Sequence, residues 1–135
     1  MRCVITGAGG LLGSALLNVM ARRGMGYTAL RKSDLDVTDV FATESRFKVE
    51  EPDVVFHCAA FTDVDRAESE RKESFAVNAG GAGKVAEACR KVGARMVFFS
   101  TDYVFDGAKR TPYSPNDEPD PLPHTGRVSL LVKTR

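Results

Sequence analysis

Short apolar runs and longer amphipathic segments alternate along this chain. The apolar runs, each closed by glycine, proline or polar residues, predict four buried strands at residues 2–6, 27–30, 53–58 and 96–99. Apolar residues at helical spacing predict helices at residues 11–23, 40–49 and 73–92. In the second of these helices, Phe41 and Phe47 are expected on the buried side.

This alternation of strands and helices predicts the α/β class. Right-handed crossovers between successive strands give a mostly parallel sheet with helices on both faces. We therefore expect the N-terminal part of a Rossmann-type doubly wound fold, with about four strands. Ligands of such folds bind outside the carboxyl ends of the strands, so the loops after the four strands are where function is expected.

Composition narrows the class of protein. The 135 residues are about one domain's worth, with 43% hydrophobic and 27% charged residues. A net charge of +1 gives no reason to expect a nucleic-acid or membrane partner, and neither a leader nor an apolar span is evident. The expected location is the cytoplasm. We interpret Cys3, Cys58 and Cys89 as reduced packing residues, not as a disulfide framework or a metal site.

The loop after the first predicted strand carries the first functional signal. Its glycines at positions 7, 10 and 13 have the spacing G-x-x-G-x-x-G between a strand and a helix. Gly7 permits a tight turn, Gly10 lets the backbone approach a pyrophosphate, and Gly13 lets the helix pack close to the sheet. Because the helix N-terminus offers unpaired N–H donors, this loop predicts a site for a nicotinamide dinucleotide.

The residues after the second strand leave two alternatives open. The acidic residue that usually selects NAD is replaced by Arg31 and Lys32, which either hold the 2′-phosphate of NADP or are solvated. Asp36 either accepts a hydrogen bond from the adenine amino group, with Val37 against the ring, or caps the next segment.

Other polar residues are expected to have structural roles. His57 ends a strand and is interpreted as packed, not catalytic. The acidic residues between the third strand and the next helix can suggest a metal site, but a solvated loop and a helix cap are the preferred interpretation. These residues are Asp63, Asp65 and Glu68.

Six segments together resemble the dTDP-4-dehydrorhamnose reductase family of extended short-chain dehydrogenases/reductases. They are T-G-A-G-G-L-L-G (6–13), D-L-D-V-T-D (34–39), P-D-V-V (52–55), C-A-A-F-T-D-V-D (58–65), V-N-A (77–79) and S-T-D-Y-V-F-D-G (100–107). The resemblance covers residues 1 to about 122. It implies a cytoplasmic oxidoreductase that uses NADPH or NADH to reduce the 4-keto group of a dTDP-linked deoxyhexose in dTDP-rhamnose biosynthesis.

The resemblance also implies roles for individual residues. Thr101 would be the hydroxyl of a Thr-Tyr-Lys catalytic triad, and Asp102 and Tyr103 would border the nucleotide-sugar substrate. Asn78 would support the loop after the fourth strand. No residue is expected to bind a metal. The residues implied for the cofactor are Gly7, Gly10, Leu11, Leu12, Arg31, Asp36, Val37, Ala59, Ala60 and Thr62.

The chain departs from the family after Leu122. Hydride transfer to a carbonyl carbon leaves charge on oxygen, and in the family a Tyr, supported by a Lys, donates the proton. Matching the family's pattern Y-G-[KR]-[ST]-K-L-A-G-E puts Thr125 at the Tyr position and Ser129 at the Lys position. Neither side chain can replace its counterpart, so we expect impaired catalysis.

The residues after 122 suggest a cause. One permitted set of codons for residues 124–134, read in a shifted frame, encodes Y-G-K-S-K-L-A-G-E-N, which is the missing motif in register. We therefore divide the chain into an incomplete NAD(P)-binding domain at residues 1–122 and an aberrant tail at residues 123–135, read out of frame to an early stop. The uncovered apolar surface of a four-stranded half-sheet predicts marginal stability or association, for which a homodimer is one form.

Two other functions remain open. One is a non-catalytic dinucleotide-binding subunit, because relatives of this family regulate methionine adenosyltransferase. The other is an epimerase or dehydratase acting on a different nucleotide sugar. The out-of-frame tail favours the impaired reductase over a selected loss of catalysis, and the S-T-D-Y-V-F-D-G segment argues against the epimerase or dehydratase.

Overall fold

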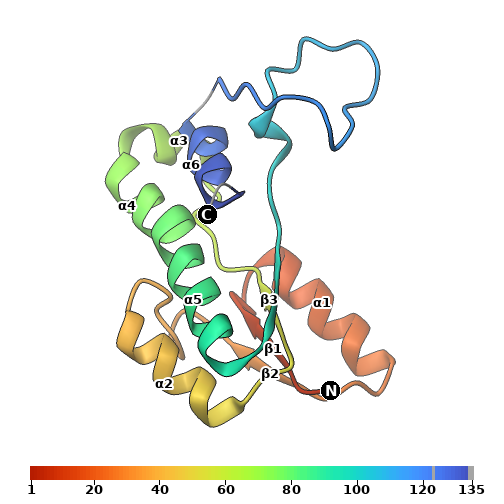
Figure 1. Ribbon diagram of the computed structural model, residues 1–135, viewed down its shortest axis with the longest axis vertical. Coiled ribbons are helices and arrows are strands. Elements are labelled where there is room, and N and C mark those ends of the chain that lie inside the picture. The colour runs from red at the N-terminus through yellow and green to blue at the C-terminus, as the bar shows by residue number, and fades with distance from the viewer. Residues whose placement is uncertain (123, 134–135) are drawn as a thin grey trace.

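The computed structural model describes residues 1–122 and 124–133. Its centre is a four-stranded parallel sheet in the order β2-β1-β3-β4 (Figure 1). The strands are β1 (Cys3–Thr6), β2 (Tyr27–Leu30), β3 (Val54–His57) and β4 (Arg95–Phe98). All four predicted strands are therefore confirmed, each within a residue or so of the expected bounds.

Helices cover both faces of the sheet, as the doubly wound pattern predicts. On one face, α1 (Leu11–Arg22) packs Met20 against Cys3 and Ile5. On the other face lie α2 (Val40–Glu50) and α5 (Ala82–Val92), which pack against each other and against the sheet. The two helix layers stand on opposite sides of the strands in Figure 1.

One predicted burial is wrong. In α2, Phe47 is fully buried, as expected, but Phe41 is 80% exposed. Phe41 is the second residue of α2, and the side of the helix that reaches the core carries Thr43 and Phe47 instead. A spacing of six residues is more than one and a half helical turns, which places Phe41 and Phe47 on different faces.

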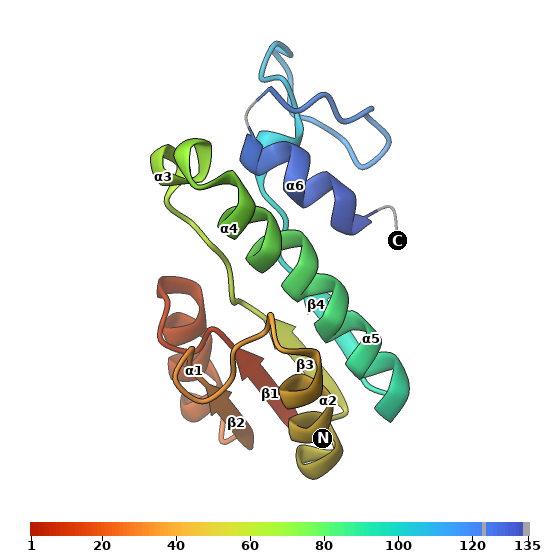
Figure 2. The same ribbon diagram turned by 90° about the vertical axis from the view of Figure 1, so that its left-hand side faces the viewer.

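The long predicted helix at residues 73–92 is three consecutive segments. These are α4 (Arg71–Phe75), the π-helical η1 (Ala76–Gly81) and α5 (Figure 2). A further short helix, α3 (Val64–Ser69), occupies part of the stretch expected to be polar and irregular. The Asp63 carboxylate accepts a hydrogen bond from the Arg66 N–H at its start, so the expected helix cap is confirmed.

The chain after β4 passes through a short 3₁₀ turn, η2 (Asp102–Val104), and a long loop before α6 (His124–Lys133). Within the loop, Phe105 stacks on Tyr113 at 4.2 Å between ring centres, and the Tyr113 hydroxyl donates to Asp106. Helix α6 lies against α3, α4 and η1, well above the sheet in Figure 2. Residues 123, 134 and 135 of the expected aberrant tail lie outside the described residues.

Three further features of the structure bear on the expectations from the sequence. Strand β4 forms one edge of the sheet, and Val97 and Phe99 on and beside it are 37% and 40% exposed. This matches the uncovered apolar surface that the sequence predicts. Across residues 1–122 and 124–133, no helix is long and apolar enough to cross a membrane. The three cysteines are free, as expected.

Candidate functional site

A cavity of about 680 Å³ opens at the carboxyl ends of the strands. The loops after all four strands contribute to its wall, together with η1 and α6. Both its volume and its place in the fold are typical of a cofactor site in a doubly wound sheet. The structure brings eleven of the sequence-predicted site residues to its wall: Gly7, Gly10, Leu11, Leu12, Asp36, Val37, Ala59, Ala60, Thr62, Thr101 and Tyr103.

The glycine loop forms one end of the cavity. Gly7 has φ +65°, and a Cβ there would lie 2.5 Å from the Ala59 backbone nitrogen, so only glycine fits. A Cβ on Gly13 would collide with the Gly7 carbonyl oxygen. Gly10 precedes α1, and no side chain of the described residues caps that helix, whose first turn also holds no acidic residue. Its N–H groups are therefore available to a phosphate.

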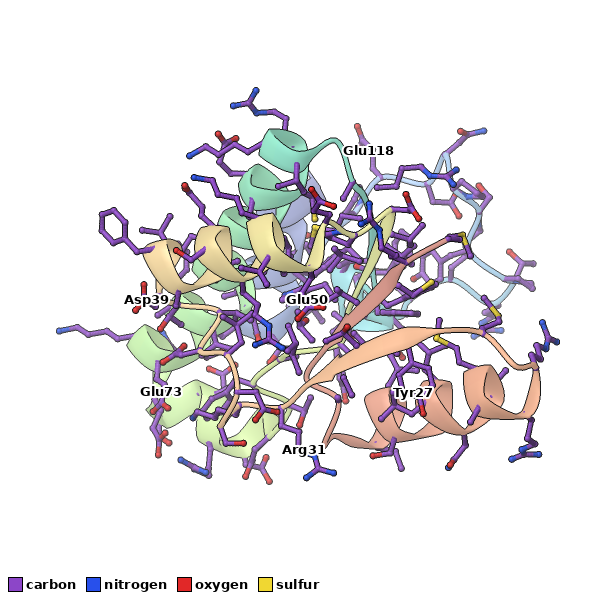
Figure 3. The ribbon with its side chains drawn as sticks, turned by 90° about the horizontal axis from the view of Figure 1, so that it is seen from below. Tyr27, Arg31, Asp39, Glu50, Glu73 and Glu118 are labelled. Atoms are coloured by element: carbon purple, nitrogen blue, oxygen red, sulfur yellow. The ribbon has the colours of Figure 1, made fainter. Side chains whose placement is uncertain are left out.

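Two cations follow β2 at the same end of the sheet. Lys32 lines the cavity, whereas Arg31 does not. Arg31 is exposed at the outer edge of the fold, and its side chain passes within 3.7 Å of where a Gly9 Cβ would be (Figure 3). The Arg31 backbone N–H donates to Asp34 Oδ2, which fixes the turn. Lys32 therefore lies on the cavity wall, and the Arg31 side chain lies beside Gly9 outside that wall.

Asp36 and Val37 form the neighbouring wall. Asp36 Oδ1 accepts hydrogen bonds from the backbone N–H and the hydroxyl of Thr38, at 2.8 and 2.7 Å. These bonds lower the pKa of Asp36 and keep its carboxylate ionised. Asp36 therefore closes a local turn on Thr38, whereas the cap of α2 is Asp39, whose carboxylate accepts from the Ala42 N–H. Val37 packs tightly on Gly81 of η1, where a Cβ would lie 2.8 Å from a Val37 methyl carbon.

The loop after β3 is fixed by Asn78. Asn78 Oδ1 accepts from the Phe61 N–H at 2.7 Å, and its Nδ2 donates to the Phe61 carbonyl at 3.0 Å. Asn78 was expected to support the loop after the fourth strand, and this is wrong: it holds the loop after the third. The π-helical segment turns its side chain toward that loop, which places Ala59, Ala60 and Thr62 on the cavity wall.

The loop after β4 contributes the hydroxyl group of Thr101. Thr101 Oγ1 donates to Asp102 Oδ1 at 3.1 Å and accepts from the Tyr103 N–H at 3.3 Å, which starts the turn η2. Thr101 and Tyr103 line the cavity. Asp102 is exposed and is not part of the cavity wall. A neutral hydroxyl such as that of Thr101 can polarise a carbonyl, but it is a poor acid.

Helix α6 completes the cavity with two small hydroxyl residues. Thr125 and Ser129 both line it, on the wall supplied by the residues after 122. The backbone of Gly126 between them packs directly on the Tyr103 carbonyl, where a Cβ would not fit. The structure therefore brings the two positions that the family resemblance assigns to Tyr and Lys into the same cavity as Thr101.

Comparison with known proteins identifies the family. Residues 1–132 match the family described as RmlD substrate binding domain. The chain belongs to the RmlD family.

Named relatives agree with this assignment. The chain is 51% identical, over 124 residues, to the dTDP-4-dehydrorhamnose reductase of Mycobacterium tuberculosis; the match covers 89% of this chain and 40% of that protein. The structure is similar to the dTDP-4-dehydrorhamnose reductase of Clostridium acetobutylicum, with TM-score 0.95, 36% identity and coverage of 99% and 48%. It is also similar to the Bacillus anthracis reductase in complex with NADP, with TM-score 0.94, 35% identity and coverage of 98% and 48%. This RmlD-family chain thus spans less than half the length of these relatives.

One residue on the cavity wall of this RmlD-family chain was not among the site residues predicted from the sequence. His57 is buried, as expected, but it also lines the cavity, and its Nε2 has no hydrogen-bond partner among the described residues. Burial lowers its pKa to about 4, so the ring is neutral at pH 7. The available signal was its place at the carboxyl end of a central strand. Burial also raises the pKa of the neighbouring Cys58 thiol.

The cavity residues fit a dinucleotide better than a metal ion. Within the described part of the chain, no group of three or more His, Cys, Asp or Glu side chains converges as a metal site would require. By contrast, the glycine cradle, the uncapped α1 N-terminus and the unpartnered His57 nitrogen all match a ligand with phosphates and polar rings.

Proposed function

We propose that this chain binds NADP(H) and corresponds to the cofactor-binding part of a reductase acting on the 4-keto group of a dTDP-linked deoxyhexose. The observation that carries the proposal is the single cavity in which the glycine loop, Asp36, Val37, the 59–62 loop and Thr101 meet. The named relatives support the substrate class, since several are dTDP-4-dehydrorhamnose reductases. Bound NADPH would supply the hydride.

The chain's own residues would bind and orient this cofactor. The N–H groups at the start of α1 would hold the pyrophosphate, and Arg31 and Lys32 would hold the 2′-phosphate of NADP. We therefore propose NADPH over NADH. A charge-reversing variant, Arg31→Glu with Lys32→Glu, is expected to lose most of the NADPH affinity and to retain NADH binding. Isothermal titration with both cofactors measures this, and equal losses for the two would contradict the assignment.

The proposed chemistry is incomplete in this chain. The Thr101 hydroxyl would orient the keto oxygen, but Thr125 and Ser129 offer neither an acidic phenol nor a cation at the opposite wall. We propose that the chain binds cofactor without measurable turnover. The double variant Thr125→Tyr with Ser129→Lys tests this, because it places the missing groups on the same helix positions. We expect NADPH oxidation with a dTDP-4-keto-deoxyhexose in the double variant, lost again when Thr101→Val is added.

Helix α6 also supports an out-of-frame origin for the tail. His124 Nε2 and Thr125 Oγ1 are buried without hydrogen-bond partners among the described residues, and so is Ser74 Oγ of α4, the helix that α6 contacts. Thr125 lines the ligand cavity, but His124 and Ser74 do not, and native interiors rarely leave such groups unpaired. This favours a reductase with an altered tail over a dinucleotide-binding regulatory subunit with a selected one. The coding DNA tests it: a shifted frame that does not encode Y-G-K-S-K refutes it.

We also propose that the chain self-associates as a homodimer. The edge strand β4, with the exposed Val97 and Phe99, supports this because unpaired strand edges and apolar patches favour association. Light scattering coupled to size-exclusion chromatography is expected to give twice the chain mass, and Val97→Lys is expected to give the monomer. A monomeric wild-type chain at micromolar concentration would contradict the proposal.

A further inference from the structure

The end of β3 places a polar side chain in the interior wall of the cavity. His57 is 2% exposed and pairs in the sheet with Thr6 of β1. His57 Nδ1 lies 2.8 Å from Thr6 Oγ1. The ring stacks on Phe98 of β4, at 6.3 Å between ring centres. Its position is thus fixed by both neighbouring strands, while Nε2 has no partner among the described residues.

The hydrogen-bond partners available to Thr6 and His57 determine which ring nitrogen of His57 carries the proton. The Thr6 hydroxyl is buried, and within the described residues its hydrogen bond is to His57 Nδ1. If Nδ1 carried the proton, the hydroxyl hydrogen of Thr6 would have no acceptor. The arrangement that satisfies both groups has Thr6 donating to Nδ1, which leaves the proton on Nε2. Because the ring is neutral at pH 7, Nε2–H is a buried donor without an acceptor.

We propose that His57 Nε2–H donates a hydrogen bond to an uncharged oxygen, a sugar hydroxyl or an amide carbonyl, of a dinucleotide bound in this cavity. The inference rests on the proposed function and adds a specific contact to it. A buried water with two to four polar partners is the other source of such an oxygen, and titration with NADPH distinguishes the two sources. Two other buried polar side chains line the cavity: Asn78, both of whose polar atoms are bonded to Phe61, and Ser129 of α6.

Nitrogen-15 NMR of the full chain tests the proposal directly. The chain has two histidines, so a His124→Gln variant assigns the ring signals of His57. At pH 7 without ligand, we expect a protonated Nε2 and an unprotonated Nδ1. A Thr6→Val variant removes the hydroxyl and is expected to mix the two forms. A protonated Nδ1 in the wild-type chain would overturn the proposal.

Titration with NADPH then separates this proposal from the proposed function. The backbone amide of Gly10 reports whether the dinucleotide binds at all. We expect the Gly10 amide and the His57 Nε2 proton to shift together with the same apparent Kd. A shifting Gly10 with an unchanged His57 overturns the inference alone, because a water then holds Nε2. An unchanged Gly10 overturns the proposed function, and the inference with it. His57→Phe, which keeps a ring but lacks the donor, is expected to weaken NADPH binding roughly tenfold.

Discussion

We expect the fold to lose stability when the pH falls from 7 to 5, through the protonation of His57. The ring is buried between Thr6 and Phe98, and burial lowers its pKa from 6.5 to about 4. In the unfolded chain the same ring takes up a proton near its ordinary pKa. The unfolded state therefore binds more protons between pH 6.5 and pH 4, so stability falls as the pH falls through this window.

The size of the effect follows from the two pKa values. A separation of about 2.5 pKa units corresponds to roughly 3 kcal/mol, reached only below pH 4. At pH 5 the same linkage gives a loss of about 2 kcal/mol relative to pH 7. Carboxylates such as Asp36 and Glu68 have lowered pKa values in the folded state, so their contribution is lost only as the pH falls through the acid range below about 4.5. The interval from pH 7 to pH 5 therefore isolates the histidines.

Urea unfolding followed by far-ultraviolet circular dichroism at pH 7 and pH 5 measures this loss. His57→Asn removes the titrating ring and retains an uncharged polar group near Thr6, and we expect its stability to change by less than about 0.5 kcal/mol over the interval. His124→Gln is the matched control and is expected to keep the full loss. A wild-type chain equally stable at both pH values, or a His57→Asn chain that keeps the loss, would refute the reasoning.

Three further tests, two of them with a matched control variant, address the packing of the glycine loop, of α2 and of the loop after β3. Gly13→Ala places a methyl group against the glycine loop and is expected to cost about 1–3 kcal/mol and weaken NADPH binding, whereas Gly83→Ala, with open space around it, is expected to stabilise by up to ~1 kcal/mol in thermal unfolding. Phe47→Ala is expected to cost about 3–5 kcal/mol and Phe41→Ala less than about 0.5 kcal/mol; similar losses would contradict the burial assigned to α2. Asn78→Ala leaves two backbone groups unpaired, with an expected cost of about 2 kcal/mol and faster amide exchange in the loop after β3.

The four strands could be predicted because each one is a short apolar run bounded by glycine, proline or polar residues. The glycine loop could also be predicted, because the positive φ of Gly7 and the close backbone contact at Gly13 exclude every residue that has a side chain. Phe41 shows where this reasoning stops. The spacing of six residues already places Phe41 and Phe47 on different faces of a helix, but only the packing of α2 shows that Phe47 is the one that meets the core.

The finer features of the cavity depend on contacts between distant residues. Asn78 and Phe61 are 17 positions apart, and nothing in either local sequence says that they are bonded. The Nε2 of His57 became noticeable only when its neighbours were known, because a histidine at a strand end is equally compatible with full satisfaction. The helical form of residues 124–133 was not predicted, since their polar and apolar residues follow no clear helical period.

The π-helical segment η1 restricts where residues can be deleted from or inserted into this chain. A π turn holds one more residue than an α turn, so it rotates everything after it by about 100° relative to a regular helix. Asn78 in η1 faces the loop after β3, while Val85 in α5 faces the core. Deleting one residue between positions 76 and 81 would restore a regular helix, but one of these two side chains would then face the wrong way. The number of residues in this helix is therefore as constrained as its sequence, whereas a surface loop such as the one before α6 can absorb insertions and deletions.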